Sequence, residues 1–255
     1  MSTATRAHAA GQGILRAVFA GPIRALHSPR QPDARATRWR SAILKSRQES
    51  PVHVGQLGLT GDSQKETKHH GGPTRAVLVY SATHYRTLWD DALGPHALAH
   101  AAALRAMSSE VDASAYGFGA FGENLTVDGL DEHLVFLGDL WRIGECELRI
   151  TEPRGPCATL TRRWMRPALL AEVKSTGAAG WYNAVQTPGR VQAGDSVRLI
   201  ERVQEEWSLA RVFHLLEDRV VSGDALRRLI KSPVAHDAMR ERLTRRLWTP
   251  GRTDA

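Results

Sequence analysis

The sequence has little cysteine, with Cys146 and Cys157 as its two thiols in 255 residues. Two thiols and no preceding secretory apolar segment argue against a disulfide-stabilised secreted domain, so we expect a reduced, cytoplasmic setting. Two thiols also exclude a zinc ribbon or an iron–sulfur cluster that needs four thiolates. No apolar run reaches the roughly 18 residues of a membrane helix, so we expect no membrane partner. No G-x-G-x-x-G motif follows a predicted strand to form a dinucleotide-binding turn.

Positive charge is concentrated at the front of the chain. The formal net charge is +7, but residues 1–47 alone hold nine basic side chains and one acid, Asp33. This segment fits a polyanion-binding arm, a transit-peptide-like leader or a solvated tail, and we favour the solvated tail, with residues 1–12 disordered. The remaining chain has 25 basic and 26 acidic side chains. This neutral body, without a nucleic-acid-binding motif, argues against a nucleic-acid partner.

Short apolar runs separated by turn residues predict a β-rich domain over residues 13–202, closed as a barrel or a related architecture. Residues 84–106 and 169–175 have helical spacing, whereas 27–40 and 55–70 are expected to be loops. The expected strands lie at 13–26 with an interruption at Gly21-Pro22, and at 41–47, 76–80, 124–127, 134–137, 141–151 and within 185–200.

From residue 203 to residue 250, apolar residues recur at helical spacing and predict a small domain of three amphipathic helices. Ser222-Gly223-Asp224 is a start signal for the second helix. Ser232-Pro233 places a serine cap before a proline in the first turn of the third helix. Three roles are open for such helices: to cover the apolar surface of the barrel, to form a homodimer with a second copy, or to bind a partner. We favour burial of the barrel surface and self-association.

The two cysteines are expected to play different roles. Cys146 lies on the apolar face of an alternating strand, which is typical of a core residue. Cys157 ends the motif P-R-G-P-C, an irregular loop that leaves the same strand. A thiolate on such a loop is a nucleophile or a metal ligand, and nearby cations favour the thiolate. The basic residues close to it in sequence are Arg154, Arg162 and Arg163.

A second candidate site is the stretch H-H-G-G-P-T-R before the predicted buried strand at 76–80. Its glycines allow close approach of the backbone to a ligand, and exposed amides can hold an anion. Lys45 and Arg75 would add positive charge to the same anion. An alternative is zinc bound by His69, His70 and Cys157. Adjacent histidines point apart on an extended chain, which argues against zinc.

Taken together, these segments resemble the MOSC family, the domain shared with the C-termini of molybdenum-cofactor sulfurases. The match is most similar to the bacterial branch that confers resistance to 6-N-hydroxylaminopurine and carries a C-terminal three-helix extension, and it covers Ile14 to Trp248. The motifs that carry the resemblance are G-L-T-G-D (58–62), H-G-G-P-T-R-A-V (70–77), F-G-E-N-L-T (121–126), P-R-G-P-C (153–157), G-A-A-G-W (177–181) and P-G-R-V-Q-A-G-D (188–195).

The resemblance implies a β-rich α+β fold, a barrel-like MOSC domain that binds the molybdenum cofactor, Mo-molybdopterin. It implies Cys157 as the protein ligand of the metal, and a soft thiolate suits a dithiolene-bound metal. On charge and loop position, Lys45, Arg75 and Arg154 are the candidates for the phosphate and pterin surroundings. Asn124 is a further candidate, with the alternative that it satisfies backbone groups in a tight turn.

The reaction implied by the resemblance is reduction of N-hydroxylated bases and related N-hydroxy compounds to amines. His70 is a candidate proton donor because its ordinary pKa is near neutral, with a structural role as the alternative. Since the chain has no room for a ferredoxin domain, we expect electrons from a separate reductase, a flavoprotein.

Two other classes of function stay open at the level of sequence. In the first, Cys157 carries a persulfide and passes sulfur on without molybdenum. In the second, the chain is a non-enzymatic anion-binding module that uses its basic front segment, and its binding would fall steeply with salt.

Overall fold

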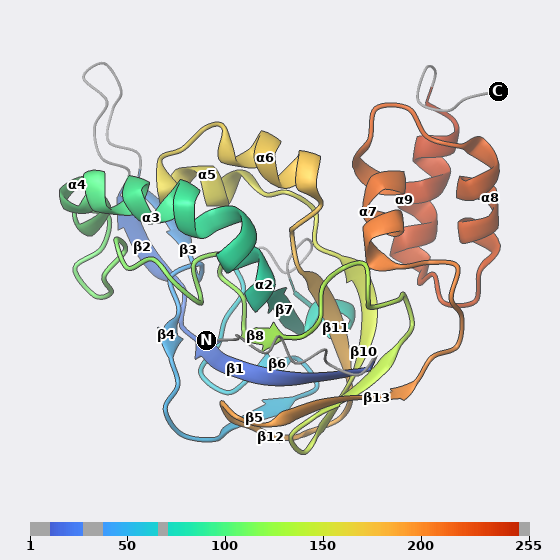
Figure 1. Cartoon of the computed structure of the whole chain (residues 1–255), viewed down its shortest axis with the longest axis horizontal. Helices are drawn as coiled ribbons and strands as arrows, with labels where there is room; N and C mark the ends of the chain where they lie inside the picture. Colours follow the sequence, from blue (N-terminus) through green and yellow to red (C-terminus); the bar gives the residue numbers. More distant parts are fainter. Residues whose placement is uncertain (1–10, 28–37, 66–70, 250–255) are drawn as a thin grey trace, which may run out of the picture.

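A closed β-barrel forms the centre of the molecule (Figure 1). The structure is a computed structural model that describes residues 11–27, 38–65 and 71–249. Neighbouring barrel strands are antiparallel except for the parallel pair β7 and β8, and β13 pairs with β1 to close the ring. The barrel strands are β1 (Gln12–Ala20), β7 (Val77–Ser81), β8 (Leu125–Asp128), β9 (Leu140–Ile143), β10 (Cys146–Pro153), β11 (Trp181–Thr187) and β13 (Ser196–Glu201).

Alternation of apolar and polar side chains explains the barrel wall. Along β10, Cys146, Leu148 and Ile150 are buried, while the residues between them are partly exposed. This confirms Cys146 as a core residue. The expected single strand at 141–151 is instead a hairpin of β9 and β10, because Gly144 turns the chain with a φ of 55°.

Short strands outside the barrel form two further sheets. The predicted strand at 13–26 is divided at Gly21-Pro22, as expected. The loop prediction for 27–40 is wrong at both ends, because His27 and residues 38–40 lie in strands; residues 28–37 lie outside the described part. The strands are β2 (Arg24–His27) with β3 (Arg38–Ser41), and β5 (Val52–Gly55) with β6 (Gly58–Leu59) and β12 (Gly189–Val191); β4 (Ser46–Arg47) pairs with β1.

The expected strand at 134–137 is wrong. Residues 131–134 form a turn, and Phe136 makes a single bridge to Ser208. The carboxylate of Asp139 accepts a hydrogen bond from the amide of Phe136 at 3.0 Å, and the guanidinium of Arg202 lies 4.1 Å above the Phe136 ring. The Asp139 carboxylate satisfies a backbone amide that a strand would have paired, so apolar content alone misled the prediction.

Helices cover one end of the barrel around a second apolar core, and they confirm the helical spacing seen at 84–106 and 169–175. The second segment ends at Gly177, whose φ is 69°. A helix at residues 158–164 was not predicted, because its basic residues mask any apolar period. The elements are α2 (Ala82–His84), the π-helix η2 (Tyr85–Trp89), α3 (Asp90–Ala99), α4 (Ala101–Arg105), α5 (Ala158–Trp164), α6 (Leu169–Thr176) and the 3-10 turn η1 (Pro73–Arg75).

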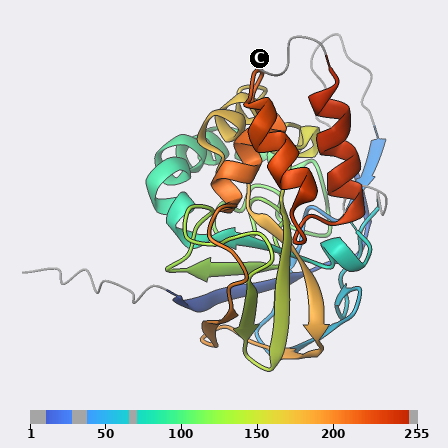
Figure 2. The ribbon, with the colours of Figure 1, turned by 90° about the vertical axis from the view of Figure 1, so that its right-hand side faces the viewer.

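The three C-terminal helices stand side by side over the barrel (Figure 2). They are α7 (Leu209–Glu217), α8 (Gly223–Lys231) and α9 (Asp237–Leu247). Their apolar faces join the barrel interior in one continuous core, so they cover barrel surface. Ser222 caps α8 as predicted. The predicted cap at Ser232 is wrong, because residues 232–235 form a turn and His236 caps α9.

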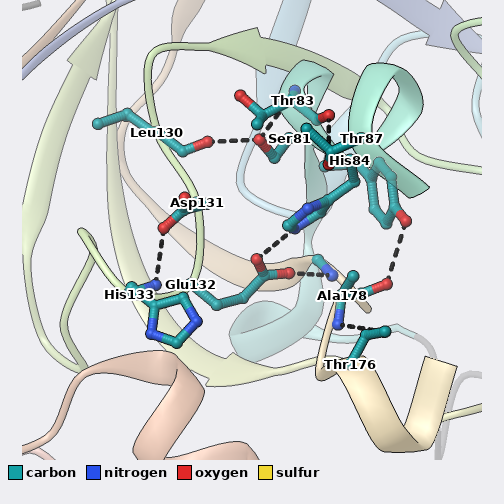
Figure 3. Close-up of polar contacts among 12 residues, drawn as sticks. Ser81, Thr83, His84, Thr87, Leu130, Asp131, Glu132, His133, Thr176 and Ala178 are labelled. Carbon is teal, nitrogen blue, oxygen red and sulfur yellow. Dashed lines mark hydrogen bonds and ion pairs between the residues drawn. The ribbon is translucent and has the colours of Figure 1, made fainter.

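A buried ion pair joins α2 to the loop that leads into β9 (Figure 3). His84 Nε2 lies 2.5 Å from the carboxylate of Glu132, which also accepts a hydrogen bond from the amide of Gly180 at 2.8 Å. Burial lowers the pKa of His84, but the charge and hydrogen bond of Glu132 outweigh this effect and leave the pKa raised above 6.5. The protonated imidazole is therefore favoured in the folded state.

This pair predicts a pH-dependent contribution to stability. Because the pKa of His84 is raised on folding, its stabilisation is complete below about pH 6.5 and is lost as pH rises through the folded-state pKa. We expect His84→Gln to lower the free energy of unfolding by on the order of 1–2 kcal/mol at pH 6 and by less at pH 8.5. Urea unfolding of both proteins at the two pH values measures this; a difference that is equal at both would contradict it.

Candidate functional site

One pocket of about 280 Å³ gathers most of the residues proposed from the sequence. Lys45, Arg75, Asn124, Arg154 and Cys157 all line it, although they come from distant parts of the chain. Another candidate, His70, lies outside the described residues together with its neighbour in the motif. The pocket is bounded by the segments 39–45, 62–65, 121–124 and 154–162 and by single residues of η1, β7 and β11.

The described lining of the pocket is strongly cationic. It has one acidic side chain, Asp62, against six basic ones. The carboxylate of Asp62 is already paired with Lys45, so the positive potential of the other basic side chains favours an anionic ligand. The basic side chains are Arg40, Lys45, Lys65, Arg75, Arg154 and Arg162.

Asp62 holds one wall of the pocket together. Its buried carboxylate forms an ion pair with Lys45 Nζ and accepts a hydrogen bond from the Gly21 amide at 3.0 Å. Burial is the largest influence on Lys45 and lowers its pKa, while Asp62 acts against this shift. From the sequence, Gly61-Asp62 is part of a loop and of the motif G-L-T-G-D, but Asp62 has no assigned role, because no local pattern shows that Lys45 lies beside it.

The side chain of Asn124 makes three hydrogen bonds within the protein. Its Nδ2 donates to Asp62 at 2.9 Å and to the Phe19 carbonyl at 3.2 Å, and its Oδ1 accepts from the Leu78 amide at 3.1 Å. These contacts join β1, β7 and the Asp62 loop. They support the turn-and-scaffold interpretation of Asn124, and its contact with a cofactor stays a prediction.

Glu123 organises the loop before β8 and was missed from the sequence. Its fully buried carboxylate accepts hydrogen bonds from the Tyr85 hydroxyl, the Gly119 and Phe121 amides and the Thr126 hydroxyl, at 2.7 to 3.2 Å. The loop contains a G-x-G-x-x-G spacing, but it precedes a strand and opens no helix, so it is no dinucleotide-binding turn. The motif F-G-E-N-L-T is therefore a scaffold of the pocket wall.

Gly122 is required in this wall. Its φ is 76°, a conformation that L side chains rarely adopt. A Cβ at this position would lie 2.9 Å from Cγ1 of Ile43. Glycine therefore lets two walls of the pocket approach each other.

Arg154 is a buried cation that faces the pocket. Its side chain is 5% exposed, and Nη1 donates to the Phe121 carbonyl at 2.8 Å. Nε has no hydrogen-bond partner within the described part of the chain. A buried donor of this kind is costly unless a ligand or water satisfies it.

Arg163 was expected from the sequence to favour the Cys157 thiolate. Its guanidinium instead donates to the carbonyls of Ile43 and Gly119 in the core.

Arg75 is oriented by a buried carboxylate. Its Nε and Nη2 donate to the two oxygens of Glu152 at 2.6 and 3.0 Å. Burial lowers the pKa of Arg75, but the hydrogen bond and charge of Glu152 outweigh it and leave the pKa raised. The guanidinium also lies 6.0 Å from the ring centre of Tyr182, another lining residue. Burial raises the pKa of Tyr182 to about 12, so its hydroxyl stays protonated.

Cys157 caps the first turn of α5. Its Sγ accepts a hydrogen bond from the Thr159 amide at 3.4 Å and is partly exposed in the pocket. The preceding residues 154–156 form the expected irregular loop, which ends β10 and starts the helix that the sequence did not reveal. A helix N-terminus and the neighbouring Arg154 and Arg162 both stabilise negative charge on sulfur.

The zinc alternative is not tested by the structure. The residues it describes contain no group of three or more His, Cys, Asp or Glu side chains that could hold a metal ion. His69 and His70, on which the alternative depends, lie outside those residues.

None of the helices in the described ranges has the length and apolar content of a membrane-spanning segment.

Comparison with known proteins relates this geometry to one family. Escherichia coli (strain K12) protein YiiM is 34% identical over 165 residues, which cover 65% of this chain and 66% of YiiM. A Gibberella moniliformis protein named Reductase is 31% identical over 207 residues, 80% of this chain and 34% of that protein. The chain thus spans just under two thirds of the first relative and about one third of the second.

Solved structures share the fold. The crystal structure of Escherichia coli YiiM has a TM-score of 0.62 and 26% identity, over 80% of this chain and 88% of that one. The crystal structure of YiiM from Geobacillus stearothermophilus has a TM-score of 0.68 and 24% identity, over 92% of this chain and 99% of that one. The MOSC domain family matches residues 66–198, more than half of the sequence. The chain therefore belongs to the MOSC domain family and has its β-barrel fold with added C-terminal helices.

Proposed function

We propose that this protein holds the molybdenum cofactor in the cationic pocket, with Cys157 as metal ligand, and reduces N-hydroxylated bases and related N-hydroxy compounds to amines. One observation carries the proposal: a cysteine sulfur at a helix N-terminus shares a pocket with a buried arginine whose Nε is unsatisfied. Membership of the MOSC family, together with the name Reductase of one relative, supports an oxidoreductase activity for this protein.

The residues of the pocket fit such a group. A thiolate is the soft ligand that a sulfur-bound transition metal prefers. The cofactor carries a phosphate, and Arg154 offers that anion a buried donor while Arg75 adds a fixed guanidinium. Lys45 is held by Asp62, so its direct role is to balance charge in the wall.

When bound, the cofactor supplies the two electrons that cleave the N–O bond. The balanced reaction consumes two electrons and two protons and yields the amine and water. Cys157 would hold the metal at the N-terminus of α5, and Tyr182 would provide an aromatic wall against a planar base. The Tyr182 hydroxyl stays protonated and can donate a hydrogen bond to the substrate, but its raised pKa makes it a weak acid, and His70 remains the proton donor proposed from the sequence.

The protein takes its electrons from a separate reductase in this proposal, which we expect to be a flavoprotein. If Cys157 binds the metal of the cofactor, Cys146 is the one other thiol in this sequence, and a single thiol cannot hold an iron–sulfur cluster. The purified protein alone is therefore expected not to consume NADPH in the presence of an N-hydroxy base, and to form amine once a reduced dye is supplied.

The first test is elemental analysis of the wild-type protein, expressed in a host that synthesises the molybdenum cofactor. We expect close to one molybdenum per chain and amine formation from 6-N-hydroxylaminopurine with reduced methyl viologen. Protein without metal but with sulfane sulfur on Cys157 would instead support the sulfur-carrier function. Bound zinc would support the site formed with His69 and His70.

A further inference from the structure

The three-helix domain contributes one side chain to the network behind the pocket. His236 caps α9, and its Nδ1 accepts a hydrogen bond from the Met239 amide at 3.3 Å. A ring nitrogen that accepts carries no proton, so the neutral imidazole has its proton on Nε2. The helix cap therefore fixes both the orientation of the ring and the atom that donates.

That donor faces Glu152 on β10. Nε2 of His236 lies 3.4 Å from Oε1 of Glu152, within ion-pair distance but without hydrogen-bond geometry, and it has no hydrogen-bond partner in the described residues. Both side chains are largely buried, 19% and 5% exposed. The same carboxylate accepts the two hydrogen bonds of Arg75, which lines the pocket. Glu152 thus joins the C-terminal domain to a cation of the site.

We propose that His236 is a positioning residue of the pocket: it restrains the Glu152 carboxylate, and this carboxylate in turn holds the Arg75 guanidinium in place for an anionic ligand. The proposal rests on the proposed function for the identity of that ligand. Burial would raise the pKa of Glu152, but the nearby imidazole of His236 and the guanidinium of Arg75 outweigh burial and lower it, so the carboxylate is ionised.

A second contact between the domain and the site supports this geometry. Gly155, in the loop that carries Cys157, lies against the ion pair of Glu217 on α7 and Arg242 on α9. A Cβ on Gly155 would lie 3.6 Å from Glu217 Oε1 and 4.0 Å from Arg242 Nη2. The three-helix domain therefore adjoins both the Arg75 side and the Cys157 side of the pocket.

Two substitutions separate positioning from helix capping. His236→Asn keeps a good N-cap but is too short to reach Glu152. His236→Gln keeps an N–H donor at the reach of Nε2 but is a poorer cap. A positioning role predicts that the asparagine variant loses pocket function and the glutamine variant keeps it. A purely structural role predicts the opposite order. Ser222→Ala, which removes the cap of a different helix, α8, is the control for general loosening of the domain.

The first readout is binding of inorganic phosphate to cofactor-free full-length protein, by isothermal titration calorimetry. We expect His236→Asn to weaken binding about threefold to tenfold, the value of one hydrogen bond, with His236→Gln and Ser222→Ala close to wild type. The loss is expected to vanish in a Glu152→Gln background, because the histidine would act only through that carboxylate. Equal phosphate affinities of the wild-type protein and the His236→Asn variant would overturn the proposal. Affinities of the variants that rank in the order of their melting temperatures would also overturn it, as would wild-type protein that binds no phosphate at millimolar concentration.

The second readout is molybdenum per chain after expression in a cofactor-producing host. We expect a lower content in His236→Asn than in His236→Gln. Wild-type protein without molybdenum would refute the proposed function, whereas the phosphate titrations would still decide the role of His236. The two failures are therefore distinguishable.

Discussion

Replacement of Cys157 by alanine is expected to abolish molybdenum binding and reduction of N-hydroxy compounds together. Loss of an outer-shell partner of a metal ligand costs about 10- to 100-fold in metal affinity, so loss of the ligand itself should leave no measurable molybdenum. The side chain is partly exposed and caps a seven-residue helix, so the cost in stability should be only about 1 kcal/mol. Elemental analysis and thermal unfolding of the same preparation measure both effects.

The matched control is Cys146→Ala. Cys146 is fully buried on β10, and burial, its largest influence, raises the pKa of its thiol to about 12. This variant should lose some stability through a small cavity and keep its molybdenum. If Cys157→Ala retained wild-type metal content and activity, the ligand assignment would be wrong. If both variants lost metal equally, unfolding of the barrel would explain the loss.

Replacement of Asp62 by alanine is expected to destabilise the protein by about 3–5 kcal/mol, the cost of leaving a buried charge without its partner. The side chains of Asp62 and Lys45 are 1% and 6% exposed, so the pair is largely shielded from water in the wild-type protein. The Gly21 amide and Asn124 Nδ2 would lose an acceptor as well. Urea unfolding measures the free energy of unfolding, and phosphate titration reports the accompanying damage to the pocket.

Asp224→Ala is the control for this prediction. Asp224 pairs with Arg227 on the surface of α8, where both side chains are more than half exposed. An exposed pair contributes at most about 1 kcal/mol, so this variant should unfold close to wild type. Equal stability of the Asp62 and Asp224 variants would show that Lys45 tolerates loss of its partner, and the proposed wall of the pocket would have to be revised.

Local patterns determined the elements wherever neighbouring residues supply the decisive contacts. Alternation along β10 and the Ser222 start signal were sufficient because a strand face and a helix cap are formed within a few residues. The same reasoning failed at 134–137 and Ser232, where apolar content and a serine–proline pair suggested a strand and a cap, but Asp139 binds the Phe136 amide and His236 caps α9 instead.

The sequence by itself determined the family, through the order and spacing of its motifs, and it selected five side chains that share one pocket. Only the tertiary structure decided which contacts these side chains make. Folding of the barrel domain brings Asp62 to Lys45 and Asn124, which are 17 and 62 residues away, and packing of the three-helix domain places His236 against Glu152 across 84 residues. Such contacts depend on how sheet and helices pack together, and residue spacing along the chain carries no record of that packing.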